Sequence, residues 1–184
     1  MNETMLNERH IISKVFSTLE VITVFSLLVI GSVALWASFF INSTVSSQLA
    51  VQKIYFPPKG SSALSSPKIG PYLNKYAGEQ LLTGNQAKAY ANHFIAVHLS
   101  EIAGGKTYAE LSTMAIANPK NIKLQNEVAT VFKGDTLIGL LLTIYAFSVV
   151  GSVALVVAVV FYVIAVIIAI LLLLRVLNHP TVSS

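Results

Sequence analysis

Two long stretches without a charged residue constrain the fold of this chain more than any other feature. One runs from Val21 to Gln52 and the other from Thr136 to Leu174. A helix needs about 20 apolar residues to cross a bilayer, so each stretch is long enough for a span. The 184 residues are 54% hydrophobic and 11% charged, which is more apolar than an ordinary soluble domain. The sequence therefore predicts an all-α membrane protein.

The distribution of charges predicts five segments. They are an N-terminal tail (1–18), a first transmembrane helix (19–41), a mainly helical domain (42–135), a long helix that includes the second transmembrane helix (136–174), and a C-terminal tail (175–184). The first apolar run exceeds the 7–15 residues of a signal-peptide core, which favours an uncleaved anchor. The expected architecture is two antiparallel transmembrane helices with the domain inserted between them.

The second stretch is too long for a single crossing. At about 1.5 Å per residue it would be nearly twice as long as the hydrocarbon layer is thick. A hairpin of two short spans would have to turn near Gly151-Ser152, where no Pro, Asn or second Gly is present. One continuous helix is the favoured alternative, with the apolar face of residues 137–145 covered by the domain.

A pentapeptide, GSVAL, occurs once in each stretch, beginning at Gly31 and at Gly151. In lipid, helices pack closely where small residues let their backbones approach. The sequence therefore predicts helix packing through small residues, and a chance match between common membrane residues is the alternative. The predicted packing residues are Gly31, Ala34, Ser38, Ser148, Gly151, Ser152, Ala154 and Ala158.

One acidic and one basic residue stand at matching ends of the two spans. Glu20 begins the first span and Arg175 follows the second. An acid at the edge of the hydrocarbon is costly without a partner, so antiparallel helices predict an ion pair between Glu20 and Arg175. The alternative is that Glu20 lies outside the hydrocarbon and is solvated.

The charges also bear on orientation. Arg9 and Lys14 precede the first span, while residues 42–134 carry nine Lys and four Glu. Long loops count little in the positive-inside rule, and the first helix usually dominates. We therefore expect a multi-pass protein of the cell membrane with both termini cytoplasmic and the domain extracytoplasmic. The sequence pI of about 9.3 indicates contact with anionic lipid or wall polymers rather than nucleic acid, and a solvated surface explains the lysines equally well.

Local patterns predict the elements of the domain. Gln52–Tyr55 suggests a short strand, and apolar residues at helical spacing predict a helix over 85–102 that Gly104 caps. Thr107 and Glu110 fit a capping box that opens a shorter helix, which Asn118-Pro119 ends. A third helical pattern, 124–132, leads towards the second span.

Few residues of the sequence are candidates for catalysis or for ligand binding. His98 and Glu101 lie three apart on one helix face, and with Tyr108 they form the only candidate ligand site. A catalytic metal generally needs three protein ligands, so the favoured interpretation places His98 at the edge of a small core with one hydrogen bond. Gly104-Gly105-Lys106-Thr107 lacks the first glycine of a phosphate-binding loop, and there is no cysteine. We expect no cofactor and no enzymatic activity.

Three segments carry a family resemblance: SSQLAVQKIYF, AKAYANHFIAVHLSEIAGGKTYAEL and FKGDTLIGLLLTIYAFSVVGSVAL. With these segments the chain resembles a family of uncharacterised two-span membrane proteins of actinobacteria, over 36 to about 174. Members are often labelled aromatic ring-opening dioxygenases, but an iron site needs a set of His and carboxylate ligands that this sequence does not offer. The resemblance implies the topology above, with GKTYAEL outside the cytoplasm, and no functional residues.

The predicted function is that of a non-enzymatic integral membrane protein. It would be an accessory or interaction subunit of a cell-envelope or respiratory membrane assembly, contacting membrane lipid and either a protein partner or copies of itself. The alternative is an anchored extracytoplasmic domain that binds a ligand or performs hydrolysis around His98, Glu101 and Tyr108.

Overall fold

A computed structural model describes residues 3–178, and the predicted tails extend beyond this range by residues 1–2 and 179–184. Within it every regular element is helical, and Tyr55 and Gln80 form an isolated antiparallel bridge. The predicted strand at Gln52–Tyr55 is wrong. The first helix continues to Gln52, because Leu49 in its last turn is buried in the core, and Lys53 then leaves the helix at φ 52°.

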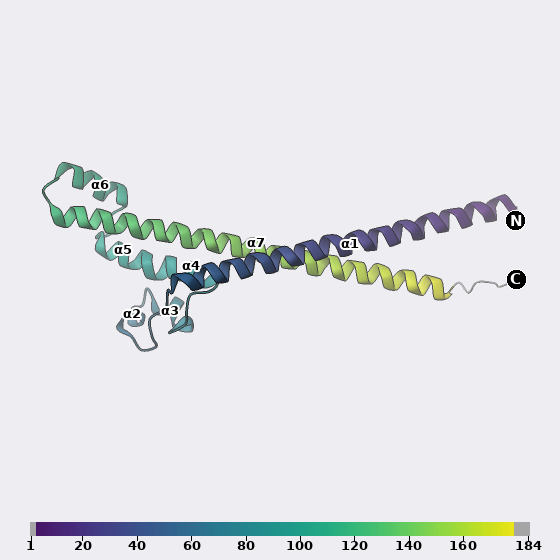
Figure 1. The fold of residues 1–184 in the computed structure, drawn as a ribbon, viewed down its shortest axis with the longest axis horizontal. Helices are drawn as coiled ribbons and strands as arrows, with labels where there is room; N and C mark the ends of the chain where they lie inside the picture. Colours follow the sequence, from purple (N-terminus) through teal and green to yellow (C-terminus); the bar gives the residue numbers. More distant parts are fainter. Residues whose placement is uncertain (1–2, 179–184) are drawn as a thin grey trace. The chain divides into compact units, whose positions relative to one another are not determined.

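Two long helices dominate the chain, α1 (Glu3–Gln52) and α7 (Ile122–Asn178), and each is one unbroken ribbon (Figure 1). Neither contains a proline. The helix α7 passes through Gly151 without a turn, as the sequence predicts, so the alternative hairpin of two short spans is wrong. The predicted segment borders near residues 18, 41, 135 and 174 all fall inside these helices. The expected borders followed the positions of charged residues, whereas helical hydrogen bonding continues across them.

The chain forms two compact units, and both long helices contribute to each. The first unit combines residues 1–40 with 151–184, and we call its described part the helix pair. The second unit comprises residues 41–150, and we call it the helical domain.

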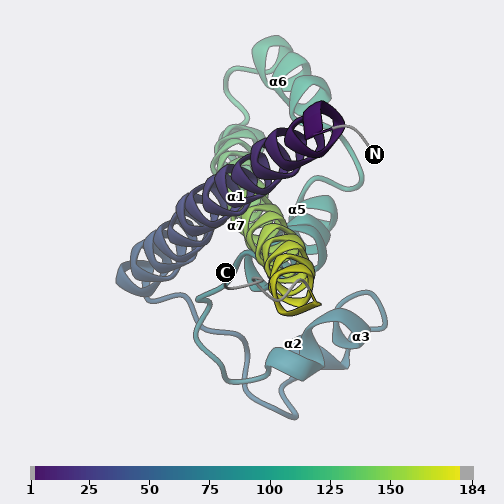
Figure 2. The same ribbon diagram turned by 90° about the vertical axis from the view of Figure 1, so that its right-hand side faces the viewer.

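After the end of α1, the helical domain continues with short elements. They are α2 (Ser62–Ser65), α3 (Gly70–Leu73) and a 3-10 turn, η1 (Asn74–Tyr76). The helices α2 and α3 lie next to each other (Figure 2), because Gly70 has no side chain and any Cβ there would overlap the Leu64 carbonyl.

The predicted helix over 85–102 is interrupted. It consists of α4 (Gly84–Tyr90), a π-helical turn η2 (Ala91–Ile95) and α5 (Ala96–Ile102). A capping box between Thr83 and Gln86 starts it. At its end Gly104, at φ 58°, donates to the Glu101 carbonyl, and Gly105 donates to that of Ser100. These two bonds make a Schellman motif, so the predicted cap at Gly104 is confirmed.

The next helix, α6 (Tyr108–Ala117), starts at the predicted capping box of Thr107 and Glu110 and ends before Asn118. Its buried face, Leu111 and Ala115, packs against Leu124 and Val131 of α7. The third predicted helical pattern is therefore the beginning of α7 rather than a separate helix.

The core of the helical domain lies where α1 and α7 are covered by the short elements. Its most buried large side chains are Leu49, Leu73, Leu81 and Leu141. They come from the end of α1, from α3, from the chain before α4 and from α7. The predicted cover over residues 137–145 is thus present.

Candidate functional site

Small residues line the interior of the helix pair. On α7 the buried positions Gly151, Ala158 and Ala165 recur every seven residues, and on α1 Gly31 and Ser38 do the same. A Cβ built on Gly31 would lie 3.5 Å from the Phe161 Cβ and 3.6 Å from the Ala158 carbonyl oxygen, so the backbones approach closely. We call these five residues the seam. A seven-residue repeat is typical of helices that cross at a shallow left-handed angle.

The predicted packing residues differ in how deeply they are buried. Gly31, Ser38, Gly151 and Ala158 are buried, Ala34 and Ala154 are half-buried, and Ser152 is exposed. Ser148 belongs to the helical domain, where it lies against Gly84 of α4.

Ala165 completes the seam. It is buried to 1% exposure and lies seven positions after Ala158. The two GSVAL copies are offset, because Gly31 lies against Ala158, Phe161 and Tyr162.

A hydrogen bond beside the seam joins the two helices. The Ser32 Oγ and Tyr162 hydroxyl are 2.8 Å apart, and Ser32 donates its own proton to the Leu28 carbonyl at 2.7 Å. Tyr162 is therefore the donor of the interhelical bond. The only sequence signal for this bond is a tyrosine within an otherwise apolar run.

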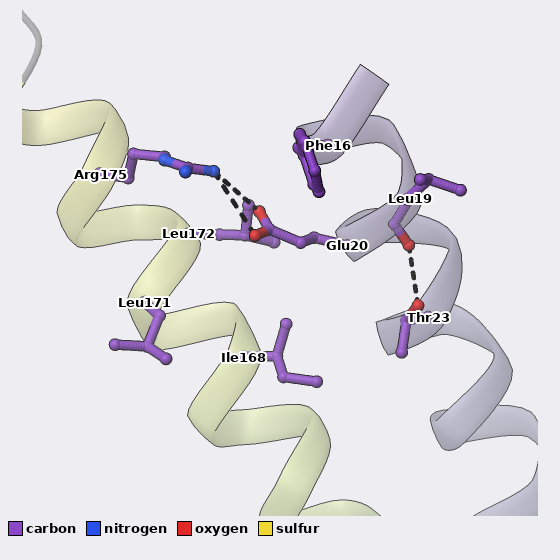
Figure 3. Close-up of a pocket in the computed structure, with 8 residues that line it drawn as sticks. All are labelled: Phe16, Leu19, Glu20, Thr23, Ile168, Leu171, Leu172 and Arg175. Carbon is purple, nitrogen blue, oxygen red and sulfur yellow. Dashed lines mark hydrogen bonds and ion pairs between the residues drawn. The ribbon is translucent and has the colours of Figure 1, made fainter. Parts of the chain in front are cut away.

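Glu20 and Arg175 lie opposite each other at one end of the helix pair (Figure 3). The Arg175 Nη1 is 3.4 Å from Oε2 and 3.5 Å from Oε1 of Glu20. Charge-assisted bonds are usually about 2.7–2.9 Å long, so this contact is loose. The Arg175 side chain is 49% exposed and that of Glu20 is 36% exposed.

A groove of about 550 Å³ accompanies this ion pair. Figure 3 shows its lining between the two helices: Phe16, Leu19, Glu20, Thr23, Ile168, Leu171, Leu172 and Arg175. None of these residues is Gly, Ala or Ser, in contrast to the seam. Large side chains replace small ones at this end, and the space between the helices opens.

The three residues of the predicted ligand site in the helical domain have different surroundings. His98 is half-buried with its Nδ1 2.7 Å from the Phe94 carbonyl, as expected for a histidine at the edge of a core. Glu101 is exposed, and the Tyr108 ring packs on Phe132 with centroids 5.6 Å apart. Among the described residues no three His, Asp or Glu side chains are close enough to hold a metal ion.

One cavity of about 270 Å³ includes Tyr108 in its lining, together with Lys106 and Asp135, but neither His98 nor Glu101 lines it. Tyr108 therefore lines a cavity whose lining the other two candidate residues do not share.

Two groups in the helical domain have a shifted pKa. Burial raises the pKa of the Tyr90 hydroxyl. The backbone N–H and hydroxyl of Thr107, with a smaller contribution from the charge of Lys106, lower the pKa of the Glu110 carboxyl. The second shift reflects the capping box, because both bonds favour the ionised carboxylate.

Comparison with protein-family models, curated proteins and solved structures finds no match to this chain. The resemblance to a two-span family therefore stays a prediction.

Proposed function

We propose that this chain is an integral membrane protein of the cell membrane, with α1 and α7 as its two spans. One observation carries the proposal: both helices are long and apolar enough to cross a membrane, yet only 11% of the most apolar stretch of each is buried within the structure. Large side chains such as Phe25, Val163 and Leu171 are exposed. A helix that is apolar all round must be covered by protein or by lipid. Lipid supplies that cover here.

The contacts within the helix pair support antiparallel spans. Glu20, early in α1, contacts Arg175, late in α7. Gly31, further along α1, lies against Ala158, which is earlier in α7. Moving forward along one helix therefore means moving backward along the other.

The depth of the spans follows from the ion pair. With Glu20 and Arg175 at one edge, a layer that takes about 20 helical residues ends near Phe40 and Leu155. The exposed rings of Trp36 and Phe40 stack near that second edge with centroids 5.5 Å apart. Aromatic residues are enriched at membrane interfaces, which supports this placement. The helical domain then lies outside the bilayer on one side, and Arg9 and Lys14 favour cytoplasmic termini.

The proposed role is that of a non-enzymatic accessory or interaction subunit of a cell-envelope or respiratory membrane assembly. Support comes from apolar side chains that the proposed spans do not include. Ile116 is 78% exposed and Ile122 is 73% exposed. Ile122 and Ile102 also line an open groove of about 490 Å³. Apolar surface in a water-exposed domain is typical of a protein contact site, so a partner or a second copy would cover it.

Isolation from native membranes in a mild detergent tests this role. We expect the wild-type chain to co-purify with a stoichiometric partner or as an oligomer, and the double variant Ile116→Ser/Ile122→Ser to lose it. Val51→Ser is the control, because Val51 is equally exposed but lies at the end of α1. A wild-type chain that is monomeric and alone after chemical cross-linking in the membrane would refute the interaction role.

A further inference from the structure

We infer that the groove between Glu20 and Arg175 binds one aminophospholipid. Its phosphate binds the Arg175 guanidinium, its ammonium binds the Glu20 carboxylate, and an acyl chain lies along the apolar wall. This inference rests on the proposed placement of α1 and α7 in a membrane.

The shape of the groove favours a flexible chain over a third helix. Helices in lipid approach one another where Gly, Ala or Ser are present, and the groove is lined instead by large residues such as Phe16, Leu19 and Leu172. Its volume of about 550 Å³ lies within the range of small-molecule sites. An acyl chain can fill the irregular space between such side chains, whereas a helix cannot come close enough.

The charges of the groove favour a zwitterionic headgroup. Arg175 contacts Glu20 only through Nη1, at 3.4 and 3.5 Å. A guanidinium has five N–H donors in a fork that matches a phosphate, so most of the donors of Arg175 remain available to a ligand. Glu20 likewise keeps acceptor capacity for an ammonium group. A headgroup with both charges complements both residues, while an anionic headgroup would be repelled by Glu20.

The depth of the charges matches the headgroup layer. Glu20 and Arg175 mark the proposed edge of the hydrocarbon. On the hydrocarbon side of them, the groove has apolar walls at Leu171 and Ile168. The hydroxyl of Thr23 donates to the Leu19 carbonyl, so it requires no polar partner from a ligand. Glu20 and Arg175 therefore lie at the level of the headgroups, and Thr23, Ile168 and Leu171 lie at the level of the acyl chains.

The test is native mass spectrometry of the full-length chain in detergent. Phosphatidylethanolamine, phosphatidylglycerol and phosphatidylcholine with identical acyl chains are added separately. We expect one phosphatidylethanolamine per wild-type chain, with the other two lipids bound more weakly. Arg175→Gln should weaken phosphatidylethanolamine about tenfold or more, because a charge-assisted bond is lost. Glu20→Gln should reverse the preference in favour of phosphatidylglycerol, because only the positive charge remains.

Matched variants separate the groove from general lipid adhesion. Thr23→Phe fills the groove and should abolish the bound lipid, whereas Thr18→Phe, on the same helix but outside the lining, should not. Lys14→Gln removes a charge near the same end and should leave binding unchanged. Equal lipid binding by the wild type, Arg175→Gln and Thr23→Phe would overturn the inference, as would a second chain bound in place of lipid.

Different results would refute the lipid site and the membrane placement. A chain that partitions into detergent but shows no dependence on Arg175 or Thr23 refutes the lipid site alone. A chain that stays in the aqueous phase without detergent refutes the membrane placement itself.

Discussion

At Gly84 the helix α4 lies close against α7. A Cβ at this position would overlap the Ser148 side chain and lie 3.3 Å from the Tyr145 Cα. The Tyr145 backbone cannot move without bending α7. We expect Gly84→Ala to lower the free energy of unfolding of the helical domain by about 1–3 kcal/mol, as overpacking does. Reversible denaturation in detergent micelles measures it.

Gly139 provides the control for this prediction. It lies inside α7, and a Cβ there would meet no atom within 4 Å. Gly139→Ala should raise the stability by about 0.5–1 kcal/mol, because alanine favours a helix over glycine. Equal effects of the two variants would show that close approach to Ser148 is not what requires glycine at position 84.

At the scale of the element, the capping box of α6 makes this helix sensitive to pH. The Thr107 bonds hold the pKa of Glu110 below its ordinary value. The contribution to stability is therefore present above the unfolded pKa of about 4.3 and is lost as the pH falls through the lower folded pKa. We expect the hydrogen-exchange protection of α6 amides, corrected for intrinsic rates, to decline over this acidic window.

The variant Glu110→Gln removes the titration and keeps the cap, because glutamine also serves at this position of a capping box. Its α6 amides should show no decline over the same window. If the protection of α6 amides depended on pH in the same way in the wild type and the variant, the prediction would be contradicted.

The elements that sequence predicted well are those fixed by local hydrogen bonding. Gly104 and the Thr107–Glu110 box form bonds within a few residues of themselves, so their spacing is sufficient to find them. The π-helical turn Ala91–Ile95 and the continuation of α1 to Gln52 depend instead on packing against distant residues such as Leu73 and Leu141. Nothing in the local pattern encodes these contacts.

The same distinction applies to the candidate site. Glu20 and Arg175 stand out because charges are rare at the ends of apolar runs, and a matched depth was enough to pair them. The groove beside them depends on where the small residues of the seam end and side chains such as Phe16 and Leu172 begin. The spacing of residues in the sequence does not reveal this change, whereas the burial of side chains in the structure does.

The arrangement of the two spans can be tested with a disulfide. The chain has no cysteine, and the Cβ positions of Gly31 and Phe161 are 3.5 Å apart, within reach of a disulfide. We expect Gly31→Cys/Phe161→Cys to oxidise readily in membranes. Trypsin cleavage in the helical domain would then leave the two fragments joined until reduction. Gly31→Cys/Val160→Cys is the control, since Val160 is exposed, and equal cross-linking of both pairs would contradict the proposed register.

At the scale of the whole molecule, the proposed spans give exposed apolar residues different surroundings along the two helices. Val163 of α7 is 52% exposed and Val51 of α1 is 72% exposed. The proposed spans place Val163 near the middle of the hydrocarbon and Val51 outside it. In water, an arginine at either position would be harmless, because neither side chain is packed.

A comparison of Val163→Arg with Val51→Arg therefore tests whether lipid or water surrounds the helix pair. An arginine at the centre of a span costs about 2.5–3.5 kcal/mol in membrane insertion, so we expect the membrane-inserted fraction of Val163→Arg to fall sharply. Val51→Arg should insert like the wild type. Alkaline extraction of membranes, followed by quantification of the chain in pellet and supernatant, measures this fraction. If both variants behaved like the wild type, lipid would not be what covers the apolar surface of α7.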